Sequence, residues 1–317
     1  MNSENRREFL KRTAAAALAA QVLPVAARAA APAAAGAAQA EAAGRPAPFA
    51  LGVITGLGND PAAAIARVKA LEMPTCQVEL GELDPERIRQ LGDALRANDI
   101  VCTALGTSGP GPDIYDFYNG PLTLGLVPRT FRAQRIEKIL QLSDYAKQLG
   151  VPAIRIHVGF IPEDPNLLLY REVIEALRQV VGYCRRNGQD FLYETGTESP
   201  VTLLRAIEDV GFDNQGVNLD TGNFILYGKA NPVDALDMIG KYVKNTHAKD
   251  GLYPTGTREL GQEVAIPHGK VDFPRLIARL KELNYQGPIT IEREISGPQQ
   301  MADVRAERDY LRRLIAA

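Results

Sequence analysis

The stretch VKNTHAKDG, Val243–Gly251, has the composition of a buried β-strand that ends abruptly in charge. Its first residues suit a strand, and the polar side chains His247, Lys249 and Asp250 follow directly. Charged groups are costly at the end of a buried strand unless something there binds them. The stretch therefore predicts a strand that presents functional side chains at its carboxyl end.

The same pattern recurs along the chain from Phe49 onward, where short apolar runs alternate with helical segments. The expected strands are FALGVIT (49–55), TCQVEL (75–80), IVCTALG (100–106), AIRIHVG (153–159), DFLYE (190–194), QGVNLD (215–220), VKNTHAK (243–249) and GPITIERE (287–294). The expected helices lie at 60–71, 84–99, 131–149, 167–187, 201–210, 232–239, 272–284 and 300–315. Continuous apolar runs are typical of strands buried on both faces, and regular alternation is typical of parallel βα units. Eight such units in about 270 residues predict a (β/α)8 TIM barrel rather than an open sheet.

The N-terminal segment has the three-part layout of an export signal. Arg6 and Arg7 precede an Ala/Leu/Val run that ends near Val25, and Ala27-Arg28-Ala29 offers a cleavage site. The paired arginines resemble the twin-arginine type. We therefore expect a signal peptide at 1–29, a disordered Ala/Pro linker at 30–48 and the barrel at 49–317. The apolar run is too short for a comfortable membrane span.

Composition narrows the class of partner. The chain carries 36 basic and 38 acidic residues, so no basic surplus points to nucleic acid. The three cysteines are widely separated and form no CxxC pair, which excludes a thiolate zinc site of the structural kind.

Charged residues occupy the ends of most of the expected strands. They are Glu79, His157, Glu194, Asp220, His247 and Glu292. In a barrel of this type the site lies where strands end and βα loops begin. The last four strands thus deliver Glu194, Asp220, His247 and Glu292 to one rim. Three carboxylates in one place repel each other unless a cation lies among them or their pKa values rise.

This ligand set predicts one divalent metal ion. One imidazole and three carboxylates suit Mn²⁺, Mg²⁺ or Co²⁺, with Zn²⁺ also compatible. Each residue alone could instead be a strand-end cap or a surface ion pair, but joint placement on consecutive strands favours a metal site.

The chain resembles the xylose-isomerase-like TIM barrels, a group of sugar isomerases, epimerases and inosose-dehydratase-type enzymes. The segments that carry the resemblance are YETG around Glu194, NLDTGN around Asp220, THAKDG around His247, GKVDF at 269–273 and TIERE around Glu292. The resemblance implies that these four residues bind one divalent metal. It also implies that Glu194 and Glu292 act as the acid–base pair on opposite faces of the substrate.

Two positions depart from the ketose 3-epimerase pattern. Asn223 stands where those enzymes have His, and Tyr253 stands where they have Arg. Asn can hydrogen-bond a hydroxyl but cannot carry a proton as His does. Lys249 shares the strand face of His247, so it is a candidate for binding substrate. His157 and His268 are further candidates for contacting substrate, against the alternative that each is structural.

The implied chemistry is removal of a proton next to a carbonyl to give an enediolate. Isomerization, epimerization, dehydration and β-elimination from a 3-keto-glycoside or inosose share this first step, and all stay open. A non-catalytic carbohydrate- or metal-binding protein is the alternative of a different class. Endonuclease-IV-like repair enzymes share the barrel, but three histidines and a slightly acidic chain argue against DNA as substrate.

The export signal predicts a periplasmic protein whose partner is the twin-arginine export machinery. An exported enzyme meets few phosphorylated sugars, so we expect a free or glycosidically linked keto-sugar as its substrate. Family members often form dimers or tetramers, and a homo-oligomer is therefore among the expectations.

Overall fold

A computed structural model describes residues 47–317 of the chain. The signal peptide expected at 1–29 lies outside the described residues, as does the linker expected at 30–48 except for Ala47 and Pro48. Within the described range no helix is both long enough and apolar enough to cross a bilayer.

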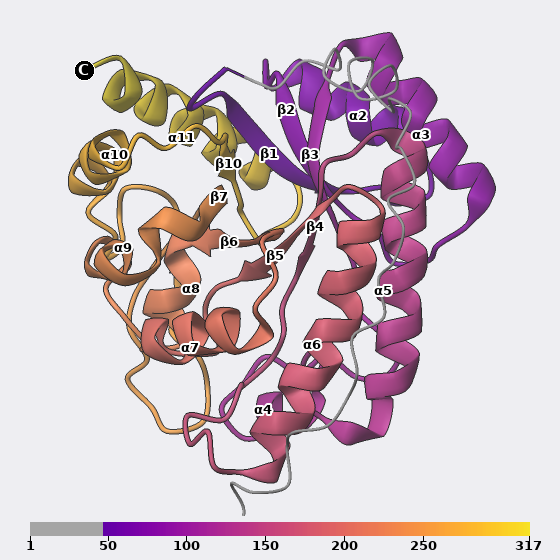
Figure 1. The fold of residues 1–317 in the computed structure, drawn as a ribbon. Coiled ribbons are helices and arrows are strands. Elements are labelled where there is room, and N and C mark those ends of the chain that lie inside the picture. The colour runs from indigo at the N-terminus through magenta and orange to yellow at the C-terminus, as the bar shows by residue number, and fades with distance from the viewer. Residues whose placement is uncertain (1–46) are drawn as a thin grey trace, which may run out of the picture. The chain divides into compact units, whose positions relative to one another are not determined.

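Eight parallel strands close into a barrel in the order β1-β10-β7-β6-β5-β4-β3-β2 (Figure 1). The barrel strands are β1 (Leu51–Gly56), β2 (Thr75–Glu79), β3 (Val101–Gly106), β4 (Ala153–Ile156), β5 (Asp190–Glu194), β6 (Gln215–Asp220), β7 (Val243–Ala248) and β10 (Ile289–Ile291). Pairing of β1 with β10, in which Leu51 lies opposite Ile289, closes the ring. The predicted (β/α)8 barrel and all eight strands are confirmed.

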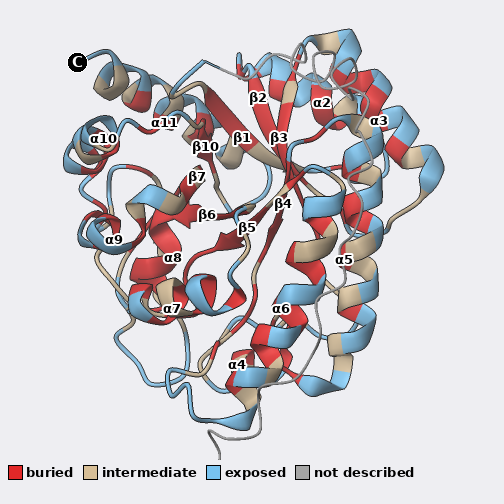
Figure 2. Cartoon of the chain, in the orientation of Figure 1, coloured by how far each residue is buried: buried red, intermediate tan, exposed pale blue. Residues whose placement is uncertain are grey.

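Helices surround the barrel, and the longer ones carry buried residues on one side and exposed residues on the other, whereas α8 is buried throughout (Figure 2). They are α2 (Pro61–Ala70), α3 (Pro85–Asn98), α4 (Gly120–Thr123), α5 (Arg129–Leu149), α6 (Leu168–Arg186), α7 (Pro200–Val210), α8 (Thr221–Leu226), α9 (Pro232–Ile239), α10 (Phe273–Glu282) and α11 (Pro298–Ala316), with a 3₁₀ turn η1 (Gly240–Tyr242). The eight expected helices are confirmed within a few residues. The short helices α4 and α8 and the two-stranded pair β8 (Asp250–Gly251) and β9 (Glu263–Val264) add to them.

Side-chain caps fix where several helices begin. Asp60 accepts a hydrogen bond from the Ala63 amide at the start of α2, and Asp84 caps α3 in the same way. In both helices proline follows the cap, where its missing N–H leaves no donor unsatisfied. The Asp-Pro pairs in the sequence thus start helices, and each helix returns the chain to the next barrel strand.

The barrel interior is partly polar. Gln77 of β2 donates to Asn218 of β6 at 2.9 Å, and Asn245 of β7 donates to Thr103 of β3 at 3.1 Å. All four side chains are buried. Barrel interiors are dominated by branched apolar residues, so this polar layer is a departure that needs a reason. The polar layer contacts side chains at the carboxyl ends of the strands, and these side chains account for it.

Candidate metal centre

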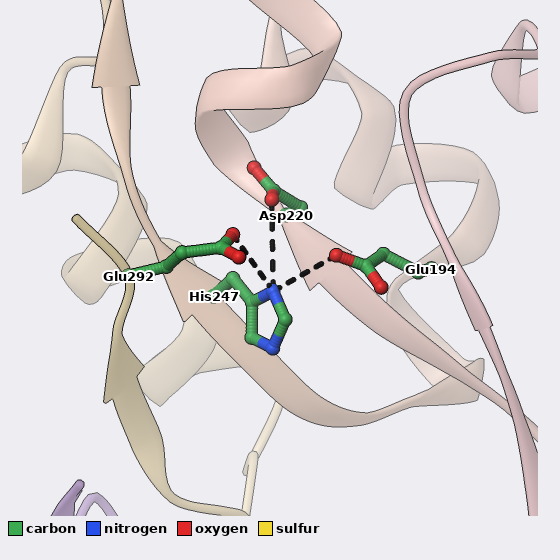
Figure 3. Close-up of side chains that lie close together, drawn as sticks. All are labelled: Glu194, Asp220, His247 and Glu292. Atoms are coloured by element: carbon green, nitrogen blue, oxygen red, sulfur yellow. Dashed lines mark ion pairs between the residues drawn. The ribbon is translucent and has the colours of Figure 1, made fainter. Parts of the chain in front are cut away.

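Four adjacent strands bring four ligand-type side chains together. Glu194 ends β5, Asp220 ends β6, His247 lies on β7 and Glu292 follows β10. The Nδ1 atom of His247 lies 3.0 Å from Glu194 Oε1, 3.6 Å from Asp220 Oδ2 and 3.1 Å from Glu292 Oε2 (Figure 3). One ligand atom from each residue lies within 4.8 Å of the others. This spacing would let a single ion contact all four.

The polar layer orients the imidazole of His247. Its Nε2 atom lies 3.0 Å from Oε1 of Gln77, whose amide group is in turn held by Asn218. With Nε2–H donating to this carbonyl oxygen, Nδ1 faces the three carboxylates. Partners of this kind commonly fix the tautomer and orientation of a metal-binding histidine.

The cluster is buried, and its charges are strongly coupled. Burial raises the pKa of Asp220 to about 7, with Glu292 adding to the effect while Lys249 and His247 oppose it. Burial would lower the pKa of His247, but Glu292 and Glu194 hold it well above its usual value. A proton on His247 thus offsets part of the negative charge, a role that a divalent cation could take over on displacing it.

Two orphaned atoms indicate that the residues fit a metal ion. Asp220 Oδ2 and His247 Nδ1 are buried, and although Nδ1 lies within ion-pair distance of the carboxylates, neither atom makes a hydrogen bond of good geometry among residues 47–317. Unpartnered buried polar atoms are rare in proteins, and a bound ion is one of their recognised explanations. Both atoms point into the cluster, and carboxylate and imidazole are suitable donors for a divalent ion of the first transition row or for Mg²⁺.

Lys249 lies beside the cluster and is 1% exposed. Its Nζ atom lies 2.8 Å from Glu294, 3.3 Å from Glu292 and 3.2 Å from the Asn223 side-chain oxygen. Burial alone would lower the pKa of Lys249, but Glu292 and Asp220 raise it well above its usual value. The side chain is therefore a fixed cation at the edge of the cluster.

Arg155 of β4 occupies the opposite side. One of its terminal nitrogens donates to Glu194 Oε2, and the other lies 2.5 Å from Glu79 Oε2. His157, just after β4, places Nε2 3.3 Å from Glu194 Oε1. Burial would raise the pKa of Glu194, but Arg155, His157 and His247 together bring it well below its usual value. Each of the two glutamates expected to move protons thus has a cation at its side.

A cavity of about 270 Å³ opens onto the cluster. Its charged lining comprises Glu79, Asp113, Arg135, Arg155, His157, Glu194, Glu292 and Glu294. Its wall is completed by Tyr115 and apolar residues of the loop between β3 and α5. The cavity could admit a small polar molecule to the carboxylates.

The structure brings most of the residues predicted for substrate contact to this region. His157 lines the cavity, and Lys249 and Asn223 lie against the cluster. His268 is exposed in the loop after β9 and is absent from the cavity lining, so the structure does not bring it to the cluster. Asp250 accepts hydrogen bonds from the amides of Gly269 and Val271 and so holds that loop in place.

Arg155 and Gln77 were missed by the sequence analysis. Each is a polar side chain flanked on both sides by apolar residues of a short strand, in AIRI and TCQVE respectively. That signal was available, because a lone charge or amide in a buried strand needs a buried partner.

The chain belongs to the xylose isomerase-like TIM barrel family, whose family model matches residues 62–314. The crystal structure of a xylose isomerase domain protein from Planctomyces limnophilus is 33% identical, with a TM-score of 0.79, and covers 84% of this chain and 97% of its own. An uncharacterized protein of Methanocaldococcus jannaschii is 27% identical over 173 residues. The match to this curated relative covers 51% of the present chain and 57% of the relative's length.

More distant solved structures share the fold, and several are sugar epimerases. A D-psicose 3-epimerase solved in the presence of D-fructose is 14% identical, with a TM-score of 0.64 over 85% of this chain and 100% of its own. The 3-keto-D-glucoside 4-epimerase of E. coli is 15% identical, with a TM-score of 0.63 over 84% of this chain and 99% of its own. A Mycobacterium smegmatis barrel in complex with magnesium is 17% identical, with a TM-score of 0.61 over 85% and 96%.

Proposed function

We propose that the protein is a divalent-metal-dependent sugar isomerase or epimerase that acts on a non-phosphorylated keto-sugar or keto-glycoside. The observation that carries this proposal is the buried group of Glu194, Asp220, His247 and Glu292, which opens onto a cavity. The sugar epimerases that share the fold support it.

These four residues would hold one divalent ion, Mn²⁺, Mg²⁺ or Co²⁺, with Zn²⁺ as a further option. When bound, such an ion supplies Lewis-acid stabilisation of the negative charge that develops on substrate oxygens. The magnesium complex of a protein with the same fold supports the choice of a hard cation.

Glu194 and Glu292 are proposed to move the protons. They approach His247 from opposite sides (Figure 3), so a sugar carbon bound between them would meet a carboxylate on each face. One glutamate removes the proton next to the carbonyl, and the other returns a proton to the opposite face. Neighbouring cations favour the ionised form of both carboxylates, and an ionised carboxylate is the form that accepts a proton.

The charges of the cavity favour a neutral substrate. Two arginines line it, and both are already engaged, Arg155 by Glu194 and Glu79, and Arg135 by loop carbonyls and Asp113. A phosphate group in the cavity would meet no unengaged guanidinium among its lining residues, whereas sugar hydroxyls would meet several acceptors.

The test is proton exchange in D₂O. Protein without residues 1–48 is loaded with Mn²⁺ and incubated with free ketoses and 3-keto-glycosides, and NMR follows deuterium entering the sugar. Incorporation that is lost in Glu292→Gln, and on removal of the metal, supports the proposal. The product distinguishes epimerization from dehydration or β-elimination, in which the same intermediate expels a leaving group. A protein that binds no divalent ion contradicts the proposal.

We further propose that residues 1–29 direct the protein to the periplasm by the twin-arginine route. Arg6 and Arg7 ahead of the apolar run support this. A reporter fused after residue 48 should be exported, and replacing both arginines by lysine should abolish export. Export that is insensitive to this change would contradict the assignment.

A further inference from the structure

The cavity extends beyond the four-residue cluster to a second charged pair. Glu79 and Arg155 also line it, and the mechanism proposed above uses neither of them as a metal ligand or a proton carrier. Arg155 is shared, with one terminal nitrogen on Glu194 and the other on Glu79. The carboxylates of Glu79 and Glu194 are therefore bridged by a single guanidinium group, and both line the same cavity.

The register of three neighbouring strands builds this pair. Glu79 of β2 lies opposite Gly106 of β3, and Gly106 lies opposite Arg155 of β4. A Cβ atom on Gly106 would overlap both the Arg155 nitrogen and the Glu79 oxygen. The absence of a side chain between them is thus what allows the ion pair to form across β3.

The two partners differ in exposure. The Arg155 side chain is 6% exposed, whereas that of Glu79 is 37% exposed although it ends a barrel strand. Since Glu79 lines the cavity, its free carboxylate oxygen is available to a molecule there. A buried arginine that holds one oxygen of a carboxylate leaves the other oriented and able to accept hydrogen bonds, which are strong when the acceptor is charged.

We propose that Glu79, held by Arg155, forms a subsite that binds the hydroxyl groups of the sugar at the end remote from the metal centre. This inference rests on the proposed function and assigns a site to the remote end of its substrate, since a polyhydroxylated chain can offer hydroxyls to Glu79 while its carbonyl end engages the cluster. A short hydroxy-ketone could engage the cluster but would not reach the subsite. Remote binding of this kind raises activity on the longer substrate.

Two variants and one control test the subsite. Glu79→Gln keeps the shape and an acceptor for Arg155 but removes the charge. Gly106→Ala changes no polar group and pushes Glu79 and Arg155 apart. Glu82→Gln, on an exposed glutamate in the segment that follows β2, is the matched control.

The probes separate the subsite from the metal centre. D-Glucitol, which has no carbonyl, measures hydroxyl recognition by calorimetry on Mn²⁺-loaded protein. D-Fructose and hydroxyacetone measure proton exchange with and without the remote hydroxyls. In both variants we expect about tenfold weaker glucitol binding and about tenfold lower kcat/KM for D-fructose. In Glu79→Gln, which leaves Arg155 on Glu194, Mn²⁺ affinity and kcat/KM for hydroxyacetone should stay within about twofold of wild type.

Equal losses on D-fructose and hydroxyacetone, or no loss on glucitol, would overturn the inference. If wild type catalyses no proton exchange on either ketone but binds glucitol more tightly than Glu79→Gln does, the proposed function is overturned and the subsite is supported. Proton exchange that is unchanged in Glu79→Gln would support the proposed function and overturn the subsite. A protein that neither exchanges protons nor binds any probe would overturn both proposals.

Discussion

At the scale of single residues, the arrangement of His247 connects the barrel interior to the site. Its Nε2 side is fixed by Gln77 from below, and its Nδ1 side faces Glu194, Asp220 and Glu292. The polar layer inside the barrel therefore has a function. It stabilises one orientation of an imidazole that would otherwise be free to rotate.

Gln77→Met should weaken metal binding without removing a ligand. Methionine fills the same volume but cannot accept the Nε2–H hydrogen bond, so the tautomer and ring position of His247 are no longer fixed. Losing such a partner typically costs 10- to 100-fold in metal affinity. Calorimetric titration with Mn²⁺ measures the effect. Gln189→Met, at a buried glutamine that bonds Ser143 instead, is the control and should leave Mn²⁺ affinity unchanged.

Asp220→Asn should have opposite effects on the thermal stability of the metal-free and the metal-bound protein. The pKa of Asp220 is raised to about 7, mainly by burial, so at pH 8 its ionised carboxylate destabilises the metal-free protein. Asparagine removes that charge and can still accept from the Asn223 amide at the start of α8. The metal-free variant should thus unfold at the same temperature as wild type or higher.

With saturating Mn²⁺, wild type should instead unfold at a higher temperature than Asp220→Asn. At a hundredfold excess over Kd a ligand adds about 2.7 kcal/mol to the stability of wild type, and far less when an anionic ligand group is lost. Thermal unfolding at pH 8 measures the difference in unfolding temperature between the two proteins, once without Mn²⁺ and once with it. An equal response of the two proteins to Mn²⁺ would remove Asp220 from the ligand set.

The sequence predicted the residues that end strands and missed those inside them. Asp220 and His247 stand where an apolar run stops, and this makes a buried charge visible. Gln77 and Arg155 lie within runs that read as core, and their partners, Asn218 and Glu79, are far away in sequence. His268 illustrates a third case, because the direction of a side chain in an irregular loop depends on packing that no local pattern records.

At the scale of elements, the long loop between β3 and α5 is held by one buried side chain. Arg135 of α5 is 2% exposed and donates to several loop carbonyls. Its hydrogen bonds reach Pro110 (3.1 Å), Pro112 (3.2 Å), Thr123 (2.5 Å) and Gly125 (2.7 Å). Since this loop supplies a wall of the cavity, Arg135 determines the shape of the site from outside the barrel.

Arg135→Met should loosen the loop while sparing the metal centre. Several loop carbonyls lose their donor together, so segment 107–126 should become accessible to limited proteolysis. The KM for a substrate of the wild-type enzyme should rise several-fold with Mn²⁺ affinity unchanged. Arg129→Met on the same helix removes only an exposed ion pair with Glu172, which is worth about 1 kcal/mol or less, and should change neither readout. Intact resistance to protease in Arg135→Met would show that the loop is held by other contacts.

Helix starts were the most predictable elements, because Asp-Pro combines a cap with a residue suited to the first turn. The short elements were not predictable. Helix α8 is six residues long, and Asp220 caps its start. One carboxylate oxygen of Asp220 accepts from the Asn223 amide, and the other faces His247. Asp220 thus both caps a helix and belongs to the cluster. The sequence shows a single acidic residue at the end of a strand, and this pattern indicates the second role but not the first.

At the scale of the whole molecule, eight repeated βα units were enough to predict a closed barrel. A parallel sheet buried on both faces needs no exposed edge when it closes, and the pairing of β1 with β10 completes that ring. The polar interior and the Arg155 fork were not predictable from periodicity. They depend on register across strands that are far apart in the chain.

Helix α11 closes the described part of the chain, and a buried acid couples its packing to pH. Glu307 is 1% exposed and accepts a hydrogen bond from the Ile266 amide at 3.0 Å. Burial raises its pKa to about 7, an effect that Ile266 and Arg293 oppose and Asp303 and Glu263 increase. The folded protein thus holds a proton on Glu307 at a pH where the unfolded chain has released it.

The sign of the resulting pH dependence follows from linkage. A raised pKa in the folded state means that stability is greatest below the unfolded pKa of glutamate, about 4.3, and declines as pH rises towards 7. The shift corresponds to about 3.5 kcal/mol. Glu307→Gln stays neutral and keeps the acceptor for Ile266. Relative to wild type, this variant should therefore gain about 2–3 kcal/mol of unfolding free energy between pH 4 and pH 8, measured by denaturant titration.

The control is Glu208→Gln on the exposed face of α7, which should give a difference from wild type that does not change with pH. A flat difference for Glu307→Gln as well would mean that Glu307 is ionised in the folded protein across this range, with Arg293 compensating its charge.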